Sequence, residues 1–404
     1  MLCQEVPAIR QTLARLSPPR AGREIRRLWG RLVRRLHGGN NRTVRLEPAG
    51  ACRGAVLLGN MIDAFPLRQD APVPHGHTNL WETRQMAETF RELDFAVDVI
   101  HWSRSAPPPP GPYAAYTDLR RNFERFAPGM NPGCLKILHI DTAHHAVYNA
   151  GQQRRLRELE ARRGIRLQPF KMLEVNRSIE AADCATMLGN DFTAGTYGFA
   201  GKPLYRIPIS SPFPYPFPED KDWAAARRRF LWFGSEGFVH KGLDLVLDAF
   251  AGLPELHLTV CGPLHREPAF ERAYRRELYA TPNIRTLGWV DVGGPVFAEI
   301  ARTTLALVYP TSSEGQSGGV VNCLHAGLIP VASFECGVDL PPDYAVRLRD
   351  CSVESIRAQA GELAARPPRE LEAMARSAWT YARTHHTRDS FAAAYRDVVR
   401  RLLA

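Results

Sequence analysis

The sequence predicts an α/β protein of two domains, each with a parallel β-sheet covered by helices. The chain has 404 residues, more than one hydrophobic core usually holds. Short apolar runs alternate with segments of helical periodicity in both halves, an order typical of parallel sheets with crossover helices. A proline-rich stretch at residues 208–218 separates the halves. Because such a stretch suits neither a sheet interior nor a helix, we interpret it as the interdomain linker.

Composition narrows the class of protein. Apolar residues make up 45% and charged residues 23% of the chain, as in ordinary globular proteins. No apolar run reaches the roughly 20 residues that cross a bilayer, and the first residues lack the apolar core of a signal peptide. We therefore expect a cytoplasmic protein. The eight cysteines are scattered without zinc or redox spacing, which favours buried reduced thiols.

Residues 1–50 form a basic arm, with eleven arginines against three glutamates in a chain of net charge +10. Within it, apolar residues of segment 23–37 recur at helical spacing, with arginines on the other face. A basic amphipathic helix of this kind can lie on an anionic membrane surface. The alternatives are a helix packed on the body of the protein and a poorly ordered tail, and all three interpretations stay open. One aromatic residue and no recognisable motif argue against nucleic acid.

The first domain is predicted at residues 51–205. A helix is expected from Thr78 through Leu93, with Glu82 in the capping-box position. Strand, helix and strand in this order imply a parallel sheet with right-handed crossovers. The predicted strands are 54–60, 95–102, 135–141 and a strand ending in 185–190.

The second domain is predicted at residues 206–380, followed by a C-terminal helix at 381–404 that is expected to pack back on the first domain. Its predicted helices are 243–253, 270–279 and the segment from Pro368 onward. Its predicted strands are 230–234, 256–261, 284–287, 305–309 and 329–333. Two such domains would face each other across a cleft, with ligands at the carboxyl ends of the strands.

One group of candidate site residues follows the strand at 230–234. Gly234 and Ser235 begin a loop, and Lys241 then opens a helix. Helix N-termini present free amides and a positive dipole end, which suit phosphates. Lys241 is one of only five lysines. The alternative is a solvated lysine at a helix start.

A second group follows the strand at 305–309. Glu314 stands at the carboxyl end of this strand, and Asn322 lies eight residues later. Between them the backbone amides of Gln316, Ser317 and Gly318 would cradle an anion or a sugar hydroxyl. The alternative is a plain polar turn between a strand and a helix.

Together these residues resemble the retaining GT-B glycosyltransferases of family 4. The shared order is a strand ending in glycine, six residues, Lys-Gly and a helix, then Gly262-Pro263, Leu287 to Val290, and finally PTSSEG followed by AGLIPVAS. The resemblance covers residues 230–335 well and the first half only loosely. It implies the GT-B fold, two Rossmann-like domains facing each other across a cleft.

The resemblance also implies roles. Lys241 would hold the diphosphate of a nucleotide-sugar donor, Glu314 would contact the donor sugar, Asn322 would face the ribose, and Trp289 would lie beside the base. The sequence departs from the family twice. Ser235 stands where an arginine is usual, and Asn322 stands where a glutamate is usual. The remaining expected donor-binding residues are Gly234, Gly262, Gln316, Ser317 and Gly318. No metal or other cofactor is expected.

In the first domain, His139, Asp141, His144 and His145 follow or end a predicted strand. We expect Asp141, His144 and His139 to be catalytic candidates beside the transferred sugar. Metal binding and plain hydrogen-bonded scaffolding are the alternatives. Gly59 and Asn60, which end the first strand, would approach the donor phosphates or the acceptor.

The sequence thus predicts a retaining glycosyltransferase that moves a sugar from a UDP- or GDP-linked donor to a glycan or glycolipid acceptor, as in polysaccharide synthesis. Two alternatives stay open. One is another GT-B enzyme, a phosphorylase or an epimerase. The other is a non-catalytic GT-B scaffold. Neither the donor sugar nor the acceptor follows from the sequence.

Overall fold

The computed structural model describes residues 39–65 and 78–404. The predicted helix at 23–37 lies outside the described residues, as does most of the predicted arm. No helix within these two ranges combines the length and apolar character needed to cross a bilayer.

The first half of the chain forms a seven-stranded sheet in the order β1-β3-β2-β4-β5-β6-β7. Strand β1 pairs with β3 in antiparallel orientation at one edge, and the other pairings are parallel. The strands are β1 Thr43–Leu46, β2 Gly54–Asn60, β3 Phe95–His101, β4 Ala115–Asp118, β5 Leu135–Ile140, β6 Cys184–Met187 and β7 Leu204–Arg206. The larger flanking helices are α3 Thr78–Glu92, α4 Arg120–Phe126 and α5 His145–Arg163, and the shorter ones are α6 Ser178–Ala181 and α7 Asp191–Thr196.

The second half forms a six-stranded parallel sheet in the order β10-β9-β8-β11-β12-β13. Its strands are β8 Arg229–Phe233, β9 His257–Cys261, β10 Ile284–Gly288, β11 Ala306–Tyr309, β12 Ile329–Ser333 and β13 Val346–Leu348. Its helices are α8 Trp223–Ala226, α9 Leu243–Phe250, α10 Pro268–Ala273, α11 Arg275–Ala280, α12 Pro295–Thr303, α13 Gly318–His325 and α14 Val353–Ala365. Helices α15 Pro368–His385 and α16 Arg388–Leu402 follow.

The predicted α/β architecture is therefore confirmed, with three differences in detail. The predicted helix at 270–279 is wrong as a single element, because it breaks at Tyr274 into α10 and α11. Glu82 does not close a capping box. Its Oε1 is buried and accepts hydrogen bonds from the amide and hydroxyl of Ser210, and this burial raises the pKa of Glu82 to about 7. Among the seven described cysteines, all free, Cys52 is exposed.

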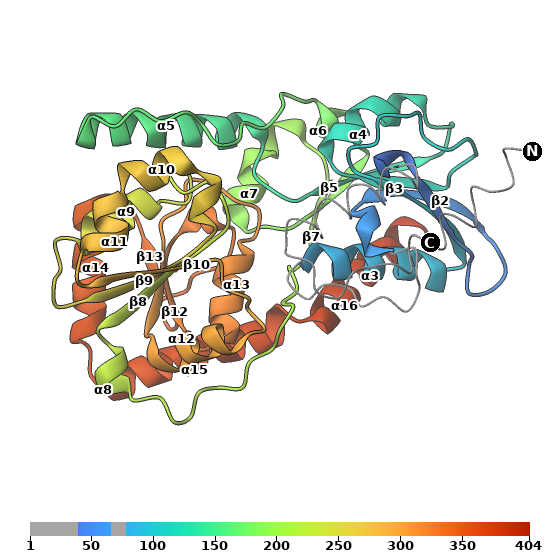
Figure 1. Cartoon of the computed structure of the whole chain (residues 1–404). Helices are drawn as coiled ribbons and strands as arrows, with labels where there is room; N and C mark the ends of the chain where they lie inside the picture. Colours follow the sequence, from blue (N-terminus) through green and yellow to red (C-terminus); the bar gives the residue numbers. More distant parts are fainter. Residues whose placement is uncertain (1–38, 66–77) are drawn as a thin grey trace, which may run out of the picture.

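Helix α5 leaves the first sheet and extends along the second domain, over α10 and α9 (Figure 1). Arg162 forms ion pairs with Asp244 and Asp248 of α9, and Arg163 pairs with Asp248 and Glu277. Leu159 packs in the apolar core of the second domain. The last helix crosses in the opposite direction, since α16 packs on α3 of the first domain.

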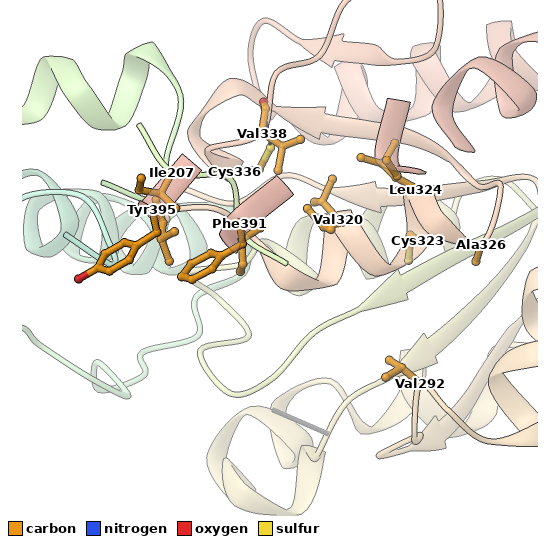
Figure 2. Close-up of a cluster of buried hydrophobic side chains, with 14 of the residues drawn as sticks. Ile207, Val292, Val320, Cys323, Leu324, Ala326, Cys336, Val338, Phe391 and Tyr395 are labelled. Atoms are coloured by element: carbon orange, nitrogen blue, oxygen red, sulfur yellow. Dashed lines mark hydrogen bonds between the residues drawn. The ribbon is translucent and has the colours of Figure 1, made fainter. Parts of the chain in front are cut away.

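A single apolar cluster continues from one domain into the other. It contains Val97 of β3 and Leu307 of β11. Figure 2 shows part of it, including Ile207 after β7, Val320 of α13 and Phe391 of α16. Helix α5, helix α16 and this cluster together fix how the carboxyl ends of the two sheets face each other.

One fold position gives a direct test of packing. Gly59 lies in buried strand β2, and a Cβ at this position would overlap the carboxylate of Asp118 on β4. We expect Gly59→Ala to lower the free energy of unfolding by about 1–3 kcal/mol, as overpacking of a core does. Urea denaturation followed by circular dichroism measures it. Gly195→Ala in α7, with nothing within 4 Å of the added carbon, should not destabilise the protein. Equal stability of Gly59→Ala and the wild type would contradict the packing account.

Candidate active site

The carboxyl edge of the second sheet has a topological switch point at β8. This strand lies between β9 and β11, so the loops that leave β8 and β11 diverge there and leave room for a ligand. The first loop carries Lys241 and the second carries Glu314. The structure brings the two together, with Lys241 Nζ 3.8 Å from Glu314 Oε1.

Lys241 is held at the start of α9. Its Nζ donates a hydrogen bond of 2.7 Å to Ser235 Oγ. The next residue, Gly242, has a φ of 71°, and a Cβ there would lie 2.5 Å from the carbonyl oxygen of Pro310. Glycine is therefore required for α9 to begin directly behind Lys241, where the free amides and the positive dipole end of a helix favour an anion.

The side chain of Glu314 is positioned by Tyr309, the last residue of β11. Its Oε1 accepts a hydrogen bond of 3.1 Å from the hydroxyl of Tyr309. Both charged side chains of the pair keep limited contact with solvent, 15% for Lys241 and 20% for Glu314. Partial burial strengthens their electrostatic effect on a ligand compared with bulk water.

His240 connects the loop that carries Lys241 to the loop that carries Glu314. Its ring nitrogens contact Ser312 Oγ at 2.9 Å and the Ser313 carbonyl oxygen at 2.7 Å. Burial lowers the pKa of His240 to about 4, because an imidazolium is poorly solvated in the protein interior. The neutral ring thus fixes the segment that leads into Glu314 without adding positive charge.

The loop between β8 and α9 is also clamped from the β9 side. Arg266 forms an ion pair with Glu236. The carboxylate of Glu267 accepts hydrogen bonds from the amides of Gly237 and Phe238. Arg266 is thus an arginine that reaches the loop next to Ser235 from another segment. The clamp, α5 and residues 166–170 together line an open cavity of about 400 Å³.

The other predicted donor-binding residues are arranged less uniformly. Ser317 is the N-cap of α13 and precedes Gly318. Gln316 Oε1 accepts a hydrogen bond from the amide of Ile209, and Asn322 Oδ1 accepts one from Ser211 Oγ. Both side chains therefore hold the interdomain linker. Trp289 is 59% exposed.

Three glycines predicted to approach a ligand have close protein neighbours on the side where a Cβ would point. A Cβ at Gly234 would lie 2.9 Å from the ring of Trp232, and one at Gly262 would lie 2.9 Å from the Gly234 carbonyl oxygen. At Gly59 the space is taken by Asp118, whose pKa burial raises well above its usual value. Asn60 is buried, and its Oδ1 accepts a hydrogen bond from the amide of Met61. These four residues are closely packed, and their predicted approach to a ligand stays a prediction.

The predicted histidine and aspartate cluster of the first domain is divided. His139 is buried in β5, where its Nδ1 contacts Thr186 Oγ1 at 2.8 Å, and burial lowers its pKa to about 4. The side chain lies beside Thr186 of the neighbouring strand β6, and the charge of Asp141 acts on the ring. Asp141 follows the strand and forms an ion pair with Arg120. His144 caps α5, and its Nδ1 accepts a hydrogen bond from the amide of Ala146.

Two further residues were missed by the sequence analysis. Arg120, at the start of α4, pairs with Asp141. Tyr148, one turn into α5, places its ring 4.2 Å from that of His240. A helix start and an aromatic residue on a polar helix are too common to single out. Their proximity to the site follows only from the folded chain.

The two domains touch at Glu314. The amide of Ala143 donates a 3.2 Å hydrogen bond to the Glu314 carbonyl oxygen. Thr193 Oγ1 donates to the carbonyl oxygens of Glu314 and Gly315. The loop after β5 and the loop after β11 therefore form adjoining walls of one site. No cluster of three His, Cys, Asp or Glu side chains that would hold a metal ion occurs among the described residues.

Comparison with known proteins identifies the architecture. No protein-family model and no curated protein matches the sequence. Sucrose-phosphate synthase from Thermosynechococcus elongatus is 12% identical, with 86% of this chain and 98% of that chain covered and a TM-score of 0.57. WaaG, a glycosyltransferase involved in lipopolysaccharide biosynthesis, is 16% identical, with 85% and 99% covered and a TM-score of 0.52. The chain has the GT-B glycosyltransferase fold that these structures share.

Another similar structure is trehalose-6-phosphate from E. coli bound with UDP-2-fluoro glucose, at 9% identity and a TM-score of 0.56, with 87% of this chain and 98% of that chain covered. The chain spans about half (53%) of the length of TarM, with 69% of this chain covered, 10% identity and a TM-score of 0.48.

The buried His240 predicts a pH effect on stability. Its folded pKa of about 4 lies below the unfolded value of about 6.5. The unfolded state therefore binds more protons between these values, and stability present above pH 6.5 is lost as pH falls toward 4. Relative to His240→Gln, the wild type should lose about 2 kcal/mol of unfolding free energy between pH 7 and pH 5. Chemical denaturation at both pH values measures this, and parallel pH profiles would contradict it.

Proposed function

We propose that this protein is a retaining glycosyltransferase that transfers a sugar from a nucleotide-diphosphate donor to a glycan or glycolipid acceptor. The observation that carries the proposal is the pair Lys241 and Glu314 at the switch point of the second sheet, 3.8 Å apart. A cation at a helix start and a carboxylate next to it suit the two parts of such a donor. The diphosphate would bind the lysine cation, and the sugar hydroxyls would donate hydrogen bonds to the carboxylate.

In this proposal the leaving diphosphate is stabilised by Lys241 and by the amides at the start of α9, which face the developing negative charge. The diphosphate departs from the same face of the sugar that the acceptor attacks, so the anomeric configuration is retained. Asp141 and His144 from the first domain lie on the sugar side of the site. The domains are already in contact there, and the partial burial of Lys241 and Glu314 strengthens these interactions.

The nucleotide is proposed to be UDP or GDP. Support for UDP comes from similar structures, one bound with UDP-2-fluoro glucose and another, HepE, in complex with UDP and glucose. The base would lie toward Trp289, whose exposed ring offers a stacking surface. Ser235 replaces a second cation in this region, and Arg266 reaches the same loop through Glu236.

Two variants test the donor site. Lys241→Ala should weaken UDP or GDP binding about 10- to 100-fold, the effect of losing one charge-assisted contact. Glu314→Gln should leave binding of the free nucleotide unchanged but reduce sugar transfer strongly. Calorimetry with free nucleotides and a nucleotide-release assay with nucleotide sugars measure the two effects.

The matched control is Arg302→Ala, which removes an exposed arginine paired with Glu299 on α12. It should behave like the wild type in both assays. Wild-type binding and transfer in both Lys241→Ala and Glu314→Gln would overturn the site assignment. A wild type that binds no nucleotide would instead favour a non-catalytic GT-B scaffold.

We also propose that residues 23–37 bind an anionic membrane surface, which would bring the enzyme to a lipid-linked acceptor. The support is the sequence pattern of arginines opposite an apolar face with Trp29. Replacing Arg26, Arg27, Arg34 and Arg35 by glutamine should abolish co-sedimentation with phosphatidylglycerol vesicles. Neither protein should sediment with phosphatidylcholine vesicles. Equal sedimentation of the variant and the wild type with the anionic vesicles would refute membrane binding by this segment.

A further inference from the structure

We propose that the hydroxyl group of Tyr148 contacts the sugar of the bound donor and sets the preference for a nucleotide sugar over the free nucleotide. The inference rests on the proposed function and names a further substrate-contacting residue for it. It is carried by the position of the tyrosine ring, by the free hydroxyl and by the groups that surround it.

The face of α5 that carries Tyr148 lies against the second domain. Residues 144, 148, 151 and 155 recur at helical spacing along this face. Gly151 lies so close to Ser312 that a Cβ would stand 3.2 Å from Ser312 Oγ, and Arg155 donates a hydrogen bond to the Pro310 carbonyl oxygen. Tyr148 therefore lies between His144 and a point of direct contact with the loop that leads to Glu314.

The ring of Tyr148 is held in place. It packs on the His240 ring with centroids 4.2 Å apart and an angle of 32° between the planes. His240 is itself fixed by Ser312 and Ser313, the two residues before Glu314. A ring fixed in this way loses little conformational freedom when its hydroxyl binds a ligand.

The hydroxyl has no hydrogen-bond partner among the described residues and is not sealed in the protein interior. Other tyrosine hydroxyls near the site are satisfied internally. Tyr309 donates to Glu314 and Tyr197 donates to the Thr142 carbonyl oxygen. A fixed polar group that remains unpaired and accessible beside Glu314 is suited to a ligand, because buried polar groups are otherwise paired.

We assign the Tyr148 hydroxyl to the sugar end of the proposed site, because the Tyr148 ring stacks on His240, which binds the two residues before Glu314. Burial, followed by the charge of Glu314, raises the pKa of Tyr148 above its usual range, and the Arg120–Asp141 pair also acts on it. The phenol thus stays protonated and able to donate a hydrogen bond. In the proposed site the diphosphate lies at Lys241 and Ser235, and the base lies at Trp289. Tyr148 stands on the other wall, with Asp141 and His144.

The test is Tyr148→Phe, which removes the hydroxyl and keeps the ring. Calorimetry would first identify the ligand that the wild type binds best among UDP-glucose, UDP-galactose, UDP-N-acetylglucosamine and GDP-mannose. The variant should bind this donor at least fivefold more weakly than the wild type does. Its affinity for the corresponding free nucleotide, UDP or GDP, should stay within twofold of the wild-type affinity. Tyr279→Phe, which alters an exposed hydroxyl on α11, is the control and should change neither affinity.

Deoxy analogues of the same donor sugar complete the test. One deoxy analogue should bind the wild type more weakly than the parent donor does, by the same factor by which Tyr148→Phe weakens binding of the parent donor. The variant should bind that analogue and the parent donor equally. Three results would overturn the proposal. Tyr148→Phe could keep the wild-type affinity for the donor, or lose affinity equally for the donor and for free UDP or GDP. The effects of the variant and of every deoxy analogue on affinity could also be additive. A wild type that binds none of these nucleotides would overturn the proposed function itself, which is a separate outcome.

Discussion

The close contact between Gly315 and the loop after β5 is the constraint on which the site depends. A Cβ at Gly315 would overlap the Asp141 carbonyl oxygen, and one at Gly337 would overlap the Gly315 carbonyl oxygen. The backbone of the first domain can therefore lie directly on the residue after Glu314. Asp141 and Glu314, which follow strands of different sheets and lie more than 150 residues apart in sequence, converge on one small region as a result.

Around this contact, some residues hold the loops in place and others are exposed enough to contact a ligand. His240, Tyr309 and the Arg266–Glu267 clamp hold the loops. Lys241, Glu314 and Asp141 retain partial exposure. Gln316 and Asn322 connect α13 to the linker at Ile209 and Ser211. The segment that joins the domains is thus tied to the helix that begins beside the site.

The sequence was most informative just after apolar runs, at Gly234, which ends one run, and in the polar loop that leads from the next run to Glu314. It missed β4, because Ala115–Asp118 has only four residues and a mixed pattern. It missed α5, whose polar residues surround the helix and whose few apolar side chains pack on the other domain. Arg120 and Tyr148 were missed because a residue at a helix start and an aromatic residue on a polar helix are too common to single out without the folded contacts with Asp141 and His240. His139 is more deeply buried than expected for a residue that contacts substrate, and its predicted role stays a prediction.

The central claim is that the pair Lys241 and Glu314 forms the donor site of a GT-B glycosyltransferase. A crystal structure of the full chain soaked with UDP or GDP tests it most directly. The account predicts the diphosphate at the start of α9, with a phosphate oxygen within hydrogen-bonding distance of Lys241 Nζ. A diphosphate bound elsewhere on the protein, with Lys241 still paired only with Ser235 and Glu314, would contradict it.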